Sequence, residues 1–292
     1  MKQTETAIIK TLAYYDIFDY PLTSAQLWKN YCGKPISYSK FSKTLTALLI
    51  RKIIFYENGY YTFYKRRPLV ELRQKREKIS QTKLKRADFF AQLLAWIPCV
   101  WFVGVSGSLA LKSAQKEDDI DFFVITAPHL LWLTRLFSTV FLDILGVRRK
   151  PLYKKAPDRI CLNMFMDRAS LILPKTEQDL YSAHEIIQLR PLVNKHGTYE
   201  SFLSSNNWIQ QFLPHATILD PIRAKPLFHI FSPFLQMFEP YARDFQLKYM
   251  AKKRTTELIS AHELQFHPED ARGWVLKEYK KRLRKWNISI LI

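Results

Sequence analysis

Apolar residues recur at helical spacing through the first fifty positions of the chain. The pattern predicts a helix over 5–16. Thr23 and Gln26 have the spacing of a capping box, so a second helix begins there. A third helix begins near Ser37, with an apolar stripe on one side and a polar, basic stripe on the other. The apolar stripes consist of Ile8, Ile9, Leu12 and Tyr15 in the first helix and of Phe41, Leu45, Leu48 and Leu49 in the third.

Two aromatic runs over 53–64 flank Asn58 and Gly59, which is the strongest short signal for a β-hairpin. After the hairpin, 70–96 has the pattern of one long helix, which Pro98 ends. The basic residues in the first half of this helix either form a solvated face or face a nucleic acid. They are Arg73, Lys75, Arg76, Lys78, Lys83, Lys85 and Arg86.

The middle of the chain contains the apolar runs that are typical of buried strands. Runs over 99–105, 120–125 and 159–167 predict three strands. A short helix is expected over 109–114, between the first two strands. From about residue 175 onward the pattern is helical. These elements predict an α+β fold with a central mixed sheet, helices around it and a helical C-terminal region.

The charge balance of the chain is strongly basic. It has 45 Lys and Arg against 26 Asp and Glu, which gives a formal net charge of +19. Such a charge produces a field that attracts polyanions, a class that includes nucleic acids, nucleotides and anionic lipids. The hydrophobic fraction of 48% excludes disorder as the general state and supports sizeable cores.

The sequence shows none of the usual marks of an exported or membrane protein. Cys32, Cys99 and Cys161 are sparse and form no CxxC pair, which indicates free thiols in a reducing compartment rather than disulfides or a zinc site. The N-terminus lacks the apolar core of a signal peptide. The most apolar segment, 129–147, is interrupted by an arginine and an aspartate. We therefore expect a cytoplasmic protein without a membrane partner.

The order of three helices and a hairpin resembles a winged helix-turn-helix domain over residues 5–66. In that family the third helix enters the DNA major groove and the hairpin touches the phosphate backbone. The resemblance implies DNA contact through the polar face of the third helix and through basic residues just beyond the hairpin. The alternative is that this module packs against another domain or protein. The residues concerned are Tyr38, Ser39, Lys40, Ser42, Lys43, Lys65, Arg66 and Arg67.

The stretch VSGSLALKSAQKEDDIDFFVI, residues 105–125, combines a small turn with two carboxylates. The turn Ser106-Gly107-Ser108 follows a buried strand and precedes a short helix, where backbone N–H groups suit a phosphate. Asp119 and Asp121 alternate with an isoleucine, so both carboxylates project from one side of the next strand. Two such oxygen ligands can hold Mg²⁺, which bridges the same triphosphate. The stretch therefore predicts a phosphoryl-transfer site.

This segment resembles the signature of the nucleotidyltransferase superfamily, whose members share a polymerase-β-like fold. The signature is a hydrophobic strand, Gly followed by Gly or Ser, about ten residues, and Asp-hydrophobic-Asp/Glu in a second strand. Gly107-Ser108 and Asp119-Ile120-Asp121 match it at this spacing. The resemblance covers about 99–167 and implies an NTP substrate with Mg²⁺ or Mn²⁺ as cofactor. It implies that the metal is held by Asp119 and Asp121 and that the triphosphate is bound by Ser106, Gly107, Ser108 and Lys112.

Two positions depart from the pattern of this family. Its members usually carry an Arg four residues after the Gly, where this chain has Leu111 with Lys112 beside it. Their third carboxylate lies on a later strand, which corresponds to 159–167, and the central polar position of that strand is Asn163. An amide oxygen can bind a metal but cannot act as a base. The alternative third carboxylates, at the strand ends, are Asp158 and Asp167.

These observations divide the chain into four expected regions. They are a winged helix over 1–66, a basic linker helix over 67–97, a nucleotidyltransferase-like core over 98–172 and a helical region over 173–292. The core would have Asp119, Asp121 and Asn163 as its catalytic residues.

The expected function is metal-dependent transfer of a nucleoside monophosphate from an NTP to an acceptor. RNA or another polyanionic acceptor suits the charge of the chain, and a small molecule or a protein stays open. The alternative is a DNA-binding or nucleotide-sensing regulator whose nucleotidyltransferase site does not turn over. A third hypothesis is an interaction scaffold with a vestigial site.

Overall fold

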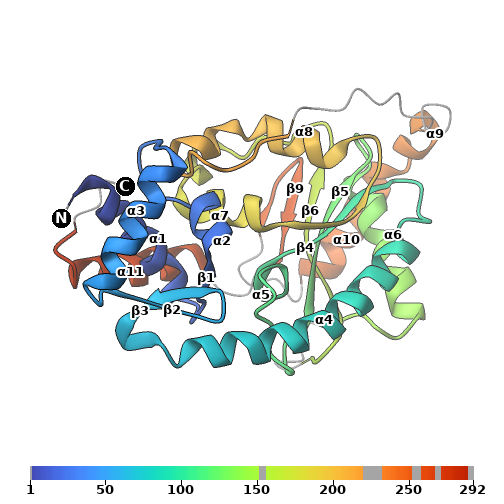
Figure 1. Cartoon of the computed structure of the whole chain (residues 1–292). Coiled ribbons are helices and arrows are strands. Elements are labelled where there is room, and N and C mark those ends of the chain that lie inside the picture. The colour runs from blue at the N-terminus through green and yellow to red at the C-terminus, as the bar shows by residue number, and fades with distance from the viewer. Residues whose placement is uncertain (1, 151–155, 220–231, 252–257, 267–270, 289–292) are drawn as a thin grey trace.

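The chain folds into helices packed on a mixed β-sheet, with a smaller, mostly helical module at its N-terminal end (Figure 1). The computed structural model describes residues 2–150, 156–219, 232–251, 258–266 and 271–288. The expected combination of helices and strands around a mixed sheet is confirmed. None of the described helices combines the length and the apolar character that crossing a bilayer requires.

Three helices and three short strands make up the N-terminal module, residues 3–63. The side chain of Thr23 accepts a hydrogen bond from the backbone N–H of Gln26, and the side-chain oxygen of Gln26 accepts one from the backbone N–H of Thr23, so the predicted capping box is confirmed. Asn58 and Gly59 have φ of 50° and 86° and form the predicted hairpin turn. The elements are α1 (Gln3–Asp16), β1 (Leu22–Thr23), α2 (Ser24–Lys29), α3 (Tyr38–Ile50), β2 (Ile54–Glu57) and β3 (Tyr60–Phe63).

The C-terminal helix α11 (Ala271–Arg284) completes the core of this module. Its buried residues Val275, Tyr279 and Leu283 pack with the apolar side of α1 and α3. The Tyr279 hydroxyl donates to the carbonyl of Lys10 at 3.2 Å. Figure 1 shows α11 beside α1, at the end of the molecule away from α6 and α10. The last described helix therefore packs with the first region of the chain, although the sequence grouped it with 173–292.

Six strands form the central sheet, in the order β7-β4-β5-β6-β9-β8. Only the β5–β6 pair is parallel among these described strands, and the other neighbours are antiparallel. All residues of β4 are buried, as the continuous apolar run predicts. The strands are β4 (Val100–Val105), β5 (Ile120–Thr126), β6 (Ile160–Asp167), β7 (Arg190–Asn194), β8 (Leu258–Ile259) and β9 (Glu263–Gln265).

The expectation of a C-terminal region built from helices alone is wrong, because β7, β8 and β9 all come from it. β8 and β9 are 2 and 3 residues long, too short for an alternating pattern to show in the sequence. β7 contains Pro191, which the sheet tolerates because β7 is an edge strand. The helices of this region before α11 are α7 (Leu180–Gln188), α8 (Thr198–Ser205), α9 (Ser232–Gln236) and α10 (Glu239–Ala251).

Helices cover both faces of the sheet. The long helix α4 (Leu69–Leu94) packs on one face with α6 (Leu131–Ile144) and α10, and α7 and α8 pack on the other face. In Figure 1, α4 runs from the hairpin of the N-terminal module along the sheet, so one helix contacts both parts. The short helix expected over 109–114 is instead the single turn α5 (Gly107–Ala110).

Candidate active site

The predicted turn and the predicted aspartates meet at one edge of the central sheet. The backbone N–H of Ser106, directly after β4, donates to the carbonyl of Asp121 in β5 at 3.1 Å. In the neighbouring parallel strand β6, Cys161 is paired with Asp121. The site therefore lies where β4 ends and where β5 and β6 begin.

Asp119, Asp121 and Cys161 form a three-residue cluster at this edge. One ligand atom from each lies within 4.8 Å of the other two, and all three residues are half-buried. The sequence indicated the two aspartates and set Asn163 beside them. The strand register sets Cys161 beside Asp121, and the pairing of β5 with β6 is irregular at Asn163, which is buried further along the strand.

Burial raises the proton affinity of the cluster. Burial is the main cause that raises the pKa of Asp121 to about 7, the charge of Asp119 adds to the rise, and Arg149 opposes it. Burial also raises the pKa of the Cys161 thiol well above its usual value, and both carboxylates raise it further. Two acidic side chains and a thiol thus lie together where their charged forms are disfavoured unless a cation joins them.

Arg149 reaches the cluster from the segment that follows α6. Its Nη1 lies 2.7 Å from Asp119 Oδ2 and 4.0 Å from Cys161 Sγ. The backbone N–H of Arg149 donates to the carbonyl of Ile160 at 2.8 Å, so the beginning of β6 holds this residue in place. A guanidinium is therefore present beside the aspartates, although the chain has Leu111 at the position where the nucleotidyltransferase signature usually has an arginine. Arg149 is 30 residues from Asp119 in the chain, so no local motif in the sequence indicates that the two side chains meet.

The Gly-Ser turn packs closely against the aspartates. Gly107 has a φ of 62°, and a Cβ atom placed there would lie 3.2 Å from Asp121 Oδ2. The hydroxyl of Ser108 donates to Asp118 Oδ2 at 2.9 Å, so this serine orders the loop that leads to the aspartates. Ser106 Oγ is buried and has no hydrogen-bond partner among the described residues. Because α5 is a single turn, its dipole is small, and phosphate binding here would depend on the turn amides and a cation.

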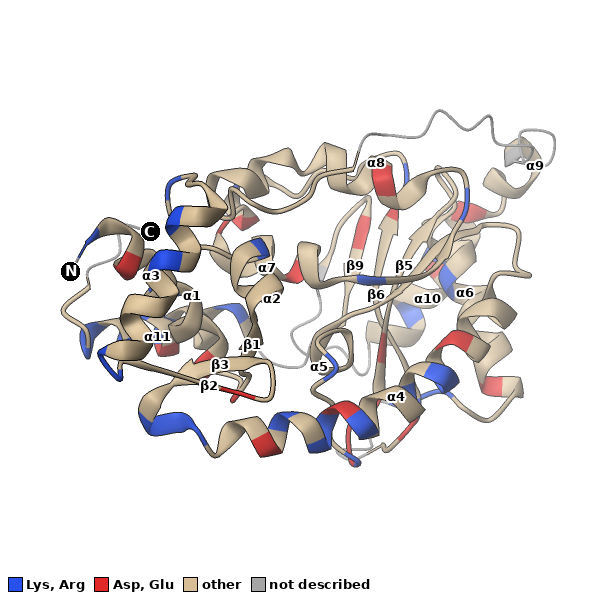
Figure 2. Ribbon diagram, viewed as in Figure 1, with Lys and Arg blue, Asp and Glu red and all other residues tan. Residues whose placement is uncertain are grey.

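Two buried cations of α4 hold the loop 111–118 in place. Lys83 Nζ donates to two loop carbonyls, at 2.7 and 3.1 Å, and to Asp158 Oδ1 at 2.7 Å. Arg73 Nη1 donates to two further carbonyls, at 2.8 and 2.9 Å, one of which belongs to Lys112. Figure 2 shows Lys and Arg distributed along α4. For Arg73 and Lys83, which are 1% and 3% exposed, neither a solvated face nor a nucleic-acid surface describes their role.

Glu185 of α7 is a further acidic residue that the sequence did not indicate. α7 leads into β7, whose first residue, Arg190, pairs with Val105 at the end of β4. Burial raises the pKa of Glu185 to about 7, and the charge of Asp121 is the second cause. A carboxyl group that titrates near neutrality can accept and release a proton under working conditions.

The residue before it, His184, joins the same helix to the N-terminal module. Its ring is fully buried and stacks on Tyr14 with 3.8 Å between ring centroids. The Tyr15 hydroxyl lies 3.2 Å from His184 Nδ1. Burial lowers the pKa of His184 to about 3, so the folded protein holds this ring neutral. Adjacent residues of α7 therefore contact the N-terminal module and sense the charge of Asp121.

Asp158 and Asp167 do not take the third position in the cluster. Asp158 is paired with Lys83. Asp167 lies at the far end of β6, where both of its carboxylate oxygens accept from the backbone N–H of His129 at 3.1 Å.

Most of the predicted nucleic-acid-binding residues are exposed. Arg66 differs, because its guanidinium pairs with Asp16 at 2.9 Å and also with Asp19, which ties the end of the hairpin to α1. The sequence-based role of Arg66 in phosphate contact therefore competes with an intramolecular one. The exposed members of the set are Ser39, Lys40 and Lys43 on α3, with Lys65 and Arg67 after the hairpin.

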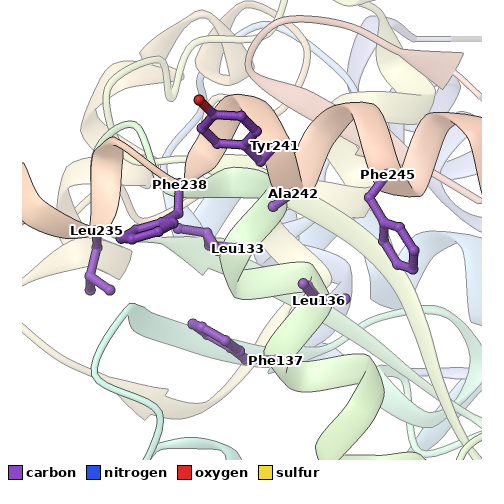
Figure 3. A pocket seen from close by; sticks show the side chains of 8 residues that line it. All are labelled: Leu133, Leu136, Phe137, Leu235, Phe238, Tyr241, Ala242 and Phe245. Atoms are coloured by element: carbon purple, nitrogen blue, oxygen red, sulfur yellow. The ribbon is translucent and has the colours of Figure 1, made fainter.

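A groove between α6 and α9–α10 offers a different kind of surface (Figure 3). All of its lining residues are aliphatic or aromatic, and they include Leu133, Phe137, Leu235, Phe238, Tyr241 and Phe245. Such a lining suits apolar contact and supplies no carboxylate or cation for phosphoryl transfer. The chemistry that the sequence predicts belongs to the Asp119–Asp121–Cys161 cluster.

The donors of this cluster fit a divalent cation. Two carboxylates supply oxygen ligands, and the missing side chain of Gly107 leaves room beside Asp121 Oδ2. The fit comes from geometry alone, since the chain matches no protein-family model, no curated protein and no solved structure.

Proposed function

We propose that the protein is a metal-dependent nucleotidyltransferase of the polymerase-β-like kind. The observation that carries this proposal is the convergence of Asp119, Asp121 and Cys161, with ligand atoms within 4.8 Å, directly beside the Gly107–Ser108 turn. Paired carboxylates next to a turn that can receive phosphate are what nucleotidyl transfer requires.

Each residue of the site has a distinct role in this proposal. A bound divalent cation supplies neutralisation of the triphosphate charge. Asp119 and Asp121 hold that cation, and the turn amides at Gly107 and Ser108 bind phosphate oxygens. Arg149 leaves its ion pair with Asp119 and binds the triphosphate instead.

The reaction joins an acceptor atom to the α-phosphorus of the NTP. The bond between that phosphorus and the oxygen bridging to the β-phosphate breaks, and pyrophosphate leaves with the bond electrons. Glu185 lies on α7, which leads into β7 beside the end of β4, and the charge of Asp121 acts on it. In this proposal it takes the proton of the acceptor, a role that its pKa of about 7 suits.

The experiment is a transfer assay with α-labelled NTPs and a divalent metal. Total RNA, the protein itself and a small-molecule extract serve as acceptors. The proposal expects label transfer by the unchanged protein and none by the Asp119→Asn/Asp121→Asn variant. Glu117→Gln is the matched control, because it removes an exposed carboxylate just outside the cluster. Transfer that survives in the double variant, or no transfer with any acceptor and metal, contradicts the proposal.

The N-terminal module supports a second function, DNA binding through a winged helix. Its three helices and antiparallel hairpin have the order of that family, and Ser39, Lys40 and Lys43 stand exposed on α3. The test measures affinity for duplex DNA at two salt concentrations. Lys40→Ala/Lys43→Ala is expected to abolish DNA binding. Lys75→Ala/Lys78→Ala removes the same amount of positive charge from α4 and should leave most of the DNA affinity. Equal losses in the two variants would assign the binding to net charge.

A further inference from the structure

The third donor of the cluster is a thiol. Strand pairing sets Cys161 beside Asp121, and its sulfur lies within 4.8 Å of the ligand oxygens of both aspartates. Arg149 Nη1 lies 4.0 Å from the same sulfur, so a positive group already approaches it. The sulfur is thus part of the site and faces the same centre as the carboxylates.

A thiol changes which metal the site prefers. Mg²⁺ takes oxygen ligands in octahedral geometry, and a sulfur donor offers it nothing. Thiolate ligands favour Zn²⁺ and related transition metals, which also accept carboxylate oxygen. Zinc sites that perform catalysis commonly have three protein ligands and one open position.

We propose that Asp119, Asp121 and Cys161 form a three-donor site for a transition metal of the Zn²⁺ and Co²⁺ class, in preference to Mg²⁺. The inference rests on the proposed function only for what the metal does, since the donor set itself determines which metal binds. On binding, the thiol releases its proton to solvent and its sulfur donates an electron pair to the metal. The fourth position stays open for an oxygen of the substrate.

The surroundings of the cluster support a preformed site. Two of the three donors are fixed relative to the turn. The backbone hydrogen bond from Ser106 to Asp121 fixes the first, and the strand pairing of Asp121 with Cys161 fixes the second. Ser106 Oγ is buried at this edge without a hydrogen-bond partner among the described residues, so a polar ligand atom here would satisfy it. Lys83 and Arg73 hold the loop that precedes Asp119.

Cobalt titration tests the proposal without any assay of transfer. Co²⁺ is added to the purified full-length protein, and the near-ultraviolet absorption that arises from thiolate-to-cobalt charge transfer is recorded. Zn²⁺ and then Mg²⁺ are added as competitors. The variants are Cys161→Ser, which removes the sulfur, and Cys161→Asp, which replaces it with a carboxylate. Cys99→Ala is the matched control, because it removes a buried thiol outside the cluster.

The proposal expects the absorption band in the unchanged protein and in Cys99→Ala, and its loss in Cys161→Ser. Zn²⁺ should displace Co²⁺ at equal concentration, whereas a hundredfold excess of Mg²⁺ should not. Cys161→Ser should lower the Zn²⁺ affinity at least tenfold, a loss of about 1.4 kcal/mol. Cys161→Asp should lack the band and gain Mg²⁺ affinity.

Three results would overturn the proposal: no Co²⁺ binding, Co²⁺ binding without the band, or equal Zn²⁺ affinity in Cys161→Ser and the unchanged protein. These outcomes are separate from those of the transfer assay. Transfer that survives in Cys161→Ser, together with Co²⁺ binding that gives no charge-transfer band in the unchanged protein, would retain the nucleotidyltransferase and reject the thiolate site. A charge-transfer band in a protein that transfers no label would retain the thiolate site and reject the nucleotidyltransferase.

Discussion

Arg149 Nη1 lies 2.7 Å from Asp119 Oδ2, at a sheet edge where burial works against a second negative charge. The ion pair balances one of the two aspartates, and Arg149 also lowers the pKa of the other, Asp121. A metal and an arginine on one carboxylate repel each other, whereas a triphosphate attracts the arginine. Under the proposed function, the pair would therefore link metal binding to nucleotide binding.

Replacing Arg149 with Gln should have opposite effects on the two ligands. Removal of the guanidinium should raise Mn²⁺ affinity in the absence of nucleotide roughly tenfold, and should lower NTP affinity by a similar factor. Calorimetric titration at pH 8, where Asp121 is ionised, measures both. Arg148→Gln is the control, because the neighbouring guanidinium binds Asp143 at 2.8 Å instead. Similar changes in both variants would show that only the general charge matters.

The close approach of Gly107 to Asp121 can be separated from its backbone conformation. Gly107→Ala and Gly146→Ala both place a side chain at positive φ, 62° and 66°, which costs about 1–2 kcal/mol of folding free energy. A Cβ at 107 also meets Asp121 Oδ2 at 3.2 Å, whereas at 146 it meets nothing within 4 Å. Urea unfolding should therefore show similar destabilisation, while metal titration should show weaker binding only for Gly107→Ala. Unchanged metal affinity in Gly107→Ala would separate the turn from the site.

Local signals explain which elements the sequence revealed. The capping box at Thr23 and Gln26 and the Asn58-Gly59 turn each act within four residues, so they are visible without the fold. The aspartates were visible for the same reason, since two carboxylates that alternate with an isoleucine at the start of an apolar run need no distant partner to be recognised.

The parts that the sequence did not reveal depend on contacts between distant residues. Arg149 contacts Asp119, and the charge of Asp121 acts on Glu185, because of the order of the strands and the path of α7, which no local pattern records. The place of Cys161 beside Asp121 depends on the register between β5 and β6, which no local pattern records. Lys83 looked like any other residue of a basic run, because its burial results from the loop that packs against it.

Lys83 should contribute to stability far more than its neighbour in the same run. Lys83→Met leaves two loop carbonyls and Asp158 without their donor, so we expect a loss of about 2–4 kcal/mol in the free energy of unfolding. Lys85→Met, at an exposed position on the same helix, should change it by less than about 0.5 kcal/mol. Urea denaturation measures both. Equal small losses would mean that the loop does not need this anchor.

Glu185 should affect the rate of transfer and not the binding of metal. Glu185→Gln keeps the shape of the side chain but cannot accept a proton, so kcat should fall by about 10²–10⁴-fold. Co²⁺ or Mn²⁺ affinity should stay within a few fold, because Asp119, Asp121 and Cys161 are unchanged. The exposed Glu200, which accepts hydrogen bonds from Asn194, provides the control substitution to Gln. A large loss of metal affinity in Glu185→Gln would instead make Glu185 a metal ligand.

The buried His184 should make the protein sensitive to acid. Burial lowers its pKa from 6.5 to about 3, so the unfolded chain binds a proton at this position at pH values where the folded chain does not. The stability that follows from the neutral ring is complete above pH 6.5 and is lost as the pH falls toward 3, by about 1.4 kcal/mol per pH unit.

Glu185 acts in the opposite direction. Its raised pKa of about 7 means that its contribution to stability is complete below its ordinary pKa and is lost as the pH rises through 7. Comparing the unchanged protein with a variant at His184 cancels this opposing effect, because both proteins contain Glu185.

The measurement is urea unfolding of the unchanged protein and of His184→Phe at several pH values between 7 and 4.5. Phe keeps a ring against Tyr14 and cannot bind a proton. The stability of the unchanged protein relative to the variant should fall by about 1.4 kcal/mol for each pH unit below 6.5. Tyr15→Phe removes the hydroxyl beside His184 Nδ1 but leaves the imidazole buried, so this control should retain the slope of the unchanged protein. Parallel pH curves for the unchanged protein and His184→Phe would mean that the folded protein tolerates a charged imidazole between α1 and α7.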